Sequence, residues 1–182
     1  MNDGLIPRRY AKALYKYALE KKVDKRIYML TANLVDAFAS QHGLLTAVAN
    51  PFVSVADKTK LLMAAAGADE KSDSVFTDFL TLLAQNGRIE FIRDIALAYR
   101  DIYRQANNIR RVTVTSAEPL AAPEEERLKS LIEKHLDGAS MEYEARTNPD
   151  LIGGFTIEIN NEKLDASVAN ELKQLRLKLI TN

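Results

Sequence analysis

The sequence predicts a mainly helical protein, in which an all-helical domain of six helices is followed by a small α+β domain with the order β-α-β-β-α. Two observations carry this prediction. Apolar residues recur every three or four positions through the first hundred residues, which is the period of an amphipathic helix. From Val112 onward, apolar and polar residues alternate as they do in a strand. We place the domain boundary near Asn107, so the expected domains are residues 1–107 and 108–182.

The first three helices follow from apolar spacing and from the residues that interrupt it. The first is expected over residues 5–20, with one apolar face at Tyr10, Ala13, Leu14 and Tyr17. The second ends near Gly43, and its apolar positions are Ile27, Leu30, Leu34 and Phe38. A short third helix over 44–49 is stopped by Asn50-Pro51, because the residue before a proline avoids the helical conformation.

The next three helices are marked by their ends. Ser54 is the expected N-cap of the fourth helix, with Asp57 three residues later, and the helix runs to Gly67. Either Ser72 or Ser74 starts the fifth, which ends at Asn86-Gly87. The sixth has its apolar positions at Phe91, Ile95, Tyr99 and Ile102.

The second domain begins with a strand at Val112 and Val114 and a helix that starts at Pro123. Two alternating runs within 141–160, separated by Asn148-Pro149-Asp150, predict a hairpin. The pair Gly153-Gly154 at the second run indicates a bend, a bulge or a close backbone approach. Asp165 is the expected N-cap of a last helix, whose apolar stripe is Val168, Leu172, Leu175 and Leu179. That stripe either packs on the sheet or docks a partner coiled coil.

Composition excludes several classes of function. The 182 residues carry no net charge and no cysteine, which argues against a dedicated nucleic-acid binder and excludes disulfides and thiol nucleophiles. His42 and His135 stand alone, and the glycines form no phosphate-binding loop. We therefore expect no catalytic residues, cofactor, metal or nucleic-acid partner. The sequence also has no apolar run long enough to span a bilayer and no signal peptide, so we expect no direct membrane insertion.

The fifth helix is the strongest candidate for an interaction surface. It is apolar around most of its circumference, except for a narrow polar stripe at Ser74, Thr77, Asp78, Thr81 and Gln85. Such a helix is either a central core helix or one that faces the core on one side and a partner helix on the other. The first helix presents the same choice, since Tyr10 and Tyr17 suit both a core and an interface.

Three segments, in order, resemble the delta subunit of F-type ATP synthases, the bacterial homologue of the mitochondrial oligomycin-sensitivity-conferring protein. They are the opening run Arg9–Leu14, the run Leu83–Arg88 and the C-terminal signature within Met141–Asn160, which Asp165-Ala166-Ser167-Val168 follows. One departure is that Ala169-Asn170 stand where many members have Arg-Gly, so an arginine contact there is not carried over. The structural signature residues are Gly153, Gly154, Phe155, Asp165, Ser167 and Val168.

The resemblance implies a non-catalytic stator subunit. Its N-terminal six-helix bundle would hold the N-terminal helix of an alpha subunit in a groove between the first and fifth helices. Its C-terminal domain would contact the peripheral-stalk b subunits. The implied groove residues are Tyr10, Ala13, Leu14, Tyr17, Phe79, Leu82 and Leu83.

The same resemblance implies a place and a role in the cell. The chain would be part of a large hetero-oligomeric membrane complex, peripheral on the cytoplasmic side of the bacterial (inner) membrane, where it helps to couple proton translocation to ATP synthesis. The alternative is a stand-alone helical adaptor that binds an amphipathic helix of another partner. Co-purification with ATP synthase distinguishes the two.

Overall fold

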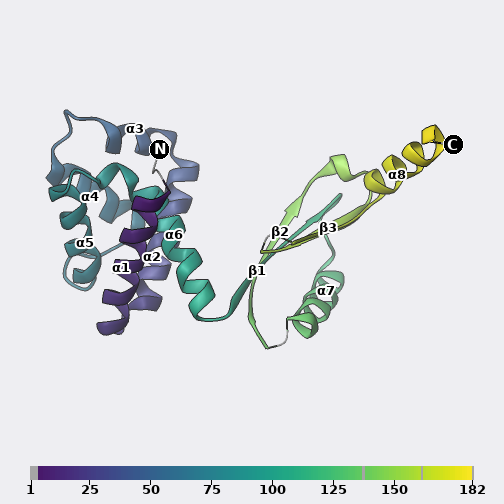
Figure 1. Ribbon diagram of the computed structural model, residues 1–182, viewed down its shortest axis with the longest axis horizontal. Helices are drawn as coiled ribbons and strands as arrows, with labels where there is room; N and C mark the ends of the chain where they lie inside the picture. Colours follow the sequence, from purple (N-terminus) through teal and green to yellow (C-terminus); the bar gives the residue numbers. More distant parts are fainter. Residues whose placement is uncertain (1–3, 137, 161, 182) are drawn as a thin grey trace. The chain divides into compact units, whose positions relative to one another are not determined.

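A computed structural model describes residues 4–136, 138–160 and 162–181, with side chains described as far as residue 177. The fold is mainly helical with a small four-stranded sheet (Figure 1). The chain divides into two compact units, one ending at Ala106 and the other beginning at Asn107. Each unit has its own core and is described by itself.

The first unit is all helical. Its elements are α1 (Leu5–Glu20), α2 (Asp24–Ser40), α3 (His42–Ala49), α4 (Val55–Ala66), α5 (Ser74–Gln85), the 3-10 turn η1 (Ile89–Phe91) and α6 (Ile92–Ala106). Helix α6 packs against both α1 and α2, and α2 also packs against α4. Tyr99 of α6 is fully buried, and its hydroxyl donates a 3.0 Å hydrogen bond to the Asp24 carbonyl at the start of α2. The apolar residues that recur along these helices therefore pack into one shared core.

Local chemistry sets the ends of the middle helices as the sequence predicts. The Ser54 hydroxyl accepts the Asp57 N–H at 3.1 Å and donates to the Asp57 carboxylate at 2.7 Å, which confirms the N-cap. Helix α4 ends at Gly67, whose φ of 66° is left-handed and favours glycine. Helix α5 begins at Ser74, one of the two expected starts.

A buried carboxylate anchors the loop between α4 and α5. Asp73 is 5% exposed and accepts two 2.8 Å hydrogen bonds from the Arg26 guanidinium of α2. It also accepts the Asp69 N–H at 2.9 Å. The hydrogen bonds from Arg26 hold the pKa of Asp73 below its ordinary value, against the opposing effect of burial. This ion pair fixes where α5 starts relative to α2.

We expect Asp73→Asn to lower the free energy of unfolding at neutral pH by about 1.5–3 kcal/mol, because charged hydrogen bonds are lost. The lowered pKa of Asp73 makes its contribution fully present above the unfolded-state pKa of about 4, and that contribution is lost as the pH falls through the folded-state pKa. The difference between wild type and variant should therefore shrink below pH ~4. Urea unfolding of both proteins between pH 3 and 7 measures it, and a difference independent of pH would contradict the prediction.

The second unit contains β1 (Ile109–Ser116), α7 (Ala122–His135), β2 (Ser140–Thr147), the 3-10 turn η2 (Pro149–Leu151), β3 (Gly154–Ile159), β4 (Glu162–Ser167) and α8 (Val168–Thr181). The strand order in the sheet is β2-β1-β3-β4. One face of the sheet packs under α7, with Val112, Val114, Ile132 and Ile157 at the centre of the core. This is the apolar face expected from the alternating pattern.

The expected hairpin between the two runs of 141–160 is wrong. Strand β2 pairs in parallel with β1, and β3 pairs antiparallel with the other edge of β1, so β1 separates them. The chain leaves β2 through η2 and through Ile152, which has a φ of 66°. It re-enters the sheet on the far side of β1. Strand period alone does not identify a strand's partner.

The element order also differs from the expectation at its end. A fourth strand, β4, forms the real hairpin with β3, and Asp165 lies within it rather than at a helix start. The cap of α8 is Ser167, whose hydroxyl accepts the Asn170 N–H at 3.2 Å. Asp165 supports that cap by accepting the Ser167 hydroxyl at 2.6 Å. The predicted N-cap is therefore displaced by two residues.

Candidate partner-binding site

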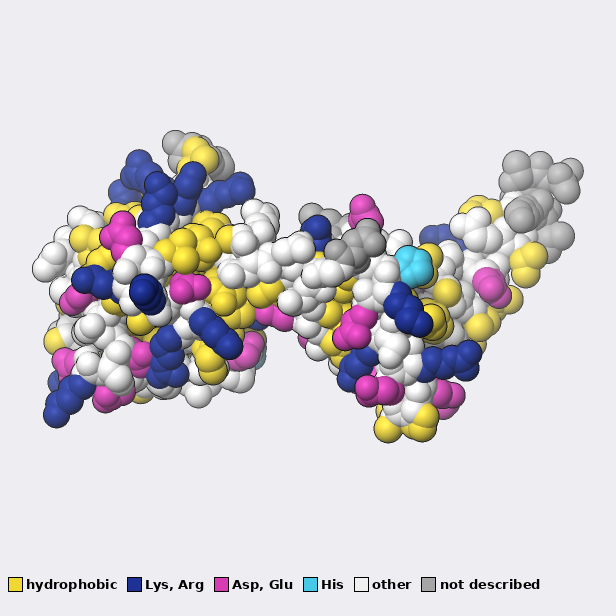
Figure 2. Space-filling view, turned by 90° about the horizontal axis from the view of Figure 1, so that it is seen from below, with side chains coloured by type: hydrophobic (Ala, Val, Ile, Leu, Met, Phe, Trp, Pro, Cys, Tyr) yellow, Lys and Arg dark blue, Asp and Glu magenta, His cyan; other side chains and the backbone are white. Residues whose placement is uncertain are grey.

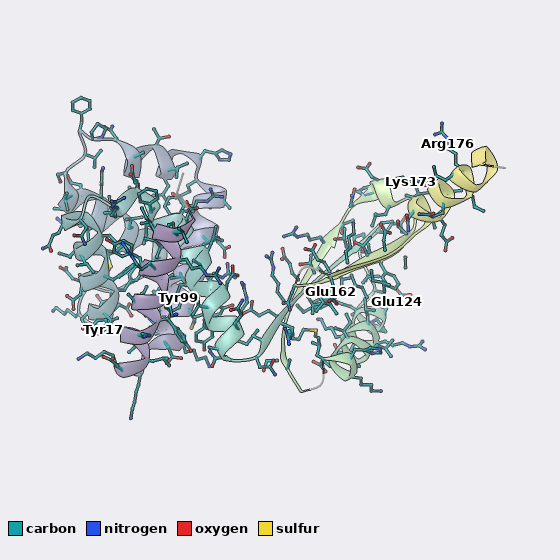
Figure 3. All side chains as sticks on the ribbon, viewed as in Figure 1. Tyr17, Tyr99, Glu124, Glu162, Lys173 and Arg176 are labelled. Atoms are coloured by element: carbon teal, nitrogen blue, oxygen red, sulfur yellow. The ribbon has the colours of Figure 1, made fainter. Side chains whose placement is uncertain are left out.

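The two flanks of α1 have different surroundings. Its buried stripe consists of Pro7, Ala11, Leu14 and Ala18. On one flank, the Tyr15 ring meets the rings of Tyr99 and Tyr103 edge-on, so this flank faces α6. At 100° of rotation per residue, Tyr10, Ala13 and Tyr17 lie on the opposite flank. Figure 3 shows Tyr17 and Tyr99 on opposite sides of α1.

Helix α5 can be oriented in the same way. It packs against α4 and also contacts α1. The Thr77 hydroxyl lies 3.6 Å from the Met63 sulfur of α4, so the Thr77 flank of α5 faces α4. Leu82 lies on the opposite flank of α5 and is 46% exposed. We call the exposed and part-buried residues Tyr10, Ala13, Tyr17 and Leu82 the α1–α5 patch.

The structure separates the seven predicted groove residues into two layers. Tyr10 is part-buried, and Ala13, Tyr17 and Leu82 are exposed, so these four are accessible to a partner. The other three lie in the core beneath them, at exposures of 2%, 6% and 0% for Leu14, Phe79 and Leu83. The buried residues can shape the patch but cannot make the first contact with a partner.

Sequence reasoning missed the charged border of this patch. Arg9 and Lys16 are the helix-surface neighbours of Ala13, four residues before it and three after it. The Lys21 ammonium lies 5.7 Å from the centre of the Tyr17 ring. The signal was present in the sequence, because the only acidic residue between Leu5 and Lys22 is Glu20.

The signature residues of the second unit hold its strands and its last helix together. Gly154 begins β3 with a φ of 71°, and a Cβ there would collide with the Ala166 carbonyl of β4. The Gly153 carbonyl accepts the Val168 N–H at 3.0 Å, and a Cβ on Gly153 would lie 3.0 Å from the Val168 side chain. Phe155 packs against the core under α7. These residues serve the fold of this unit.

The apolar stripe of α8 is largely uncovered. Val168, Leu172 and Leu175 are 38%, 52% and 56% exposed, while Leu179 lies outside the described side chains. The interpretation that this stripe packs on the sheet is therefore wrong for Leu172 and Leu175, whereas Val168 lies against Gly153. Because exposed leucines in a row suit a protein contact, the stripe is a second candidate surface.

The face of the sheet away from α7 carries charged side chains that are already paired. Glu144 accepts hydrogen bonds from Arg111 at 3.1 Å and from Arg146 at 2.9 Å, and these bonds lower its pKa against the effect of burial. Both guanidinium groups line a hollow of about 210 Å³, together with Thr113, Glu158 and Asn160. The compensated charges make this hollow a poor site for a phosphate.

Within the described part of the chain, no cluster of three His, Asp or Glu side chains is placed to hold a metal ion. None of the described helices combines the length and the apolar character needed to cross a membrane.

A family model described as the ATP synthase delta (OSCP) subunit matches residues 6–179. The chain belongs to this family. Its membership makes it a subunit of an F-type ATP synthase, and a role in the peripheral stalk fits the family.

Curated delta-family relatives match over nearly the full length. The ATP synthase subunit delta of Bacteroides thetaiotaomicron is 37% identical, over 99% of this chain and 96% of the relative. That of Parabacteroides distasonis is 34% identical, over 100% and 99% of the two chains. Among solved structures, a chain in the Toxoplasma gondii mitochondrial ATP synthase hexamer gives a TM-score of 0.75 at 20% identity, covering 96% of this chain and 97% of that one. This last likeness shows a shared fold.

Proposed function

We propose that this delta-family protein is a non-catalytic part of the stator, joining the catalytic head of the ATP synthase to the b subunits of the membrane sector. The observation that carries the proposal is that each compact unit leaves an apolar helix surface uncovered among the described residues. The first is the α1–α5 patch, and the second is the stripe of Val168, Leu172 and Leu175 on α8. A tether needs two such contacts, one for each of the bodies it joins.

In this proposal the first unit acts as a six-helix bundle, and its α1–α5 patch receives the N-terminal helix of an alpha subunit. An amphipathic helix of a partner would cover the exposed side chains of Tyr17 and Leu82. The α8 stripe would receive the b subunits. The protein would then lie peripherally on the cytoplasmic side of the bacterial (inner) membrane, held there by its partners.

The mechanism is mechanical. Proton translocation drives the rotor, and the rotor exerts torque on the catalytic head. Without a tether the head would turn with the rotor, and ATP synthesis would be uncoupled from proton flow. The tether needs contacts that dissociate slowly, and buried apolar contacts supply slow dissociation better than exposed charges do.

The deciding experiment is recovery of partner subunits from membranes with tagged full-length protein. We expect alpha and b subunits to co-purify with it. Recovery of neither would contradict the stator proposal and favour the stand-alone adaptor.

We expect Leu175→Glu to lower recovery of b subunits severalfold without changing the affinity for an alpha N-terminal peptide, because a carboxylate would interrupt the α8 stripe. Leu131→Glu is the matched control, since Leu131 lies on α7 and is 51% exposed, close to the 56% of Leu175. Equal recovery of b by both variants would remove α8 from the stalk contact.

A further inference from the structure

The charge of the first unit is concentrated on its first helix. Between Leu5 and Lys22 there are six basic residues against the single acidic Glu20, although the whole chain is neutral. The basic residues are Arg8, Arg9, Lys12, Lys16, Lys21 and Lys22. Figure 2 shows Lys and Arg side chains gathered along the upper edge of the first unit.

Three of these six cations are exposed and take part in no ion pair among the described residues, whereas Lys21 lies over the Tyr17 ring. The three are Arg9, Lys12 and Lys16. By contrast, Arg26 of the same unit is paired with Asp73 at 2.8 Å. A row of unpaired cations on one helix face is available to a partner of opposite charge.

The row borders the α1–α5 patch on one side only. Arg9 and Lys16 flank Ala13 on the helix surface, and Lys12 continues the row one turn before Lys16. Lys21 stands over the ring of Tyr17 at the end of α1. The outer border on α5 carries the polar side chains Asp78, Thr81 and Gln85, of which only Asp78 is charged. The patch is therefore electrically asymmetric, basic toward α1 and weakly acidic toward α5.

We propose that the α1–α5 patch selects an amphipathic helix of another subunit that carries acidic residues along the flank facing α1. The inference rests on the proposed use of this patch for docking, and it adds the charge pattern and the orientation of the occupant. An occupant turned end to end would present its acidic flank to α5 and meet Asp78 instead of the cations. Complementary charge of this kind raises the association rate and fixes the orientation of the bound helix more than it increases the affinity.

The first test uses two synthetic helical peptides with an identical leucine stripe, one with glutamates along one flank and the other with lysines at those positions. Binding to the full-length protein is measured by fluorescence anisotropy at 20 mM and 500 mM salt. At low salt we expect the glutamate peptide to bind at least about tenfold more tightly than the lysine peptide. At high salt this difference in affinity should be largely lost. Equal binding of the two peptides, or binding of neither, would overturn the inference.

The second test reverses the charge row with Arg9→Glu, Lys12→Glu and Lys16→Glu in one variant. The matched control is Lys60→Glu, Lys71→Glu and Arg93→Glu, which changes the net charge equally at exposed positions outside α1 and α5. Only the first variant should lose the preference for the glutamate peptide, and it should prefer the lysine peptide instead. Circular dichroism checks that both variants are folded.

The outcomes separate this inference from the proposed function. If alpha subunits still co-purify with the protein, but the two peptides bind equally and reversing the charge row changes neither affinity, the charge inference fails alone. If alpha subunits are not recovered with the wild type, the proposed function fails, while a glutamate preference of the patch would still support the charge inference.

Discussion

Leu82→Glu is expected to weaken binding of the alpha N-terminal helix by about 30-fold or more, which corresponds to at least ~2 kcal/mol. The leucine side chain is 46% exposed in the free protein, and an apolar partner would bury it. A carboxylate in that position would be desolvated without a partner. The fold should tolerate the change, since the side chain lies at the edge of the core. Titration of the full-length variant with an alpha N-terminal peptide measures the loss.

Three further variants make this expectation specific. Tyr10→Asp should weaken binding in the same way, because Tyr10 lies on the α1 side of the same patch. Leu97→Glu is the matched control, since Leu97 is 39% exposed and lies on α6. Glu20→Lys, at the end of α1, should have a smaller effect than either patch variant. Equal affinities for Leu82→Glu and Leu97→Glu would remove the patch from the binding site.

Gly154→Ala is expected to destabilise the second unit by about 2–5 kcal/mol, and this expectation rests on the geometry of the sheet. An alanine held at the φ of 71° costs about 1–2 kcal/mol. The added methyl would also collide with the Ala166 carbonyl of β4, which is backbone and cannot rotate away, and such overpacking costs about 1–3 kcal/mol. Amide hydrogen exchange of β3 measures the loss, with the amides of α1 as an internal reference.

The control for this prediction is Gly138→Ala in the same unit. Gly138 also has a left-handed φ, 81°, but no atom lies within 4 Å of the place its Cβ would take. This variant should be destabilised only by the conformational cost of the left-handed backbone, about 1–2 kcal/mol. If both variants accelerate exchange equally, the close approach of β3 and β4 at Gly154 does not contribute.

Helix positions in the first unit were predictable because their causes are local. The Ser54 cap and the left-handed Gly67 each depend on neighbours within a few residues, and the apolar period follows from one turn of helix. The pairing of strands was not predictable in this way. Whether β2 meets β3 or β1 depends on contacts between distant segments, and the alternating pattern is the same in both cases.

Strand β4 was missed for a different reason. Its side chains are exposed at every position from Glu162 to Ala166, so an edge strand with no buried face leaves no alternation in the sequence. The Asp-x-Ser-Val element then resembled a helix start. In the structure the capping hydroxyl belongs to Ser167, and Asp165 holds it in place.

The candidate site was predictable as a pair of helices but not as a surface. The spacing of Tyr10, Leu14 and Tyr17 places them on one stripe of α1. Only the packing of Tyr15 against α6 shows which edge of that stripe remains accessible to a partner. The charged border depends on the same orientation. Arg9 and Lys16 become meaningful only when Ala13 between them is known to face outward.

The place of β1 in the sheet has a consequence for a protein that carries load. Strand β1 begins at Ile109, three residues after α6 ends, and it is hydrogen-bonded to β2 on one edge and to β3 on the other. Tension arriving from the first unit therefore enters the second through an interior strand rather than an edge strand. A pull along that strand loads both of its ladders together, in shear, so no single hydrogen bond takes the force alone. An edge strand in the same position would carry the same pull on a single ladder, with about half as many hydrogen bonds to share it.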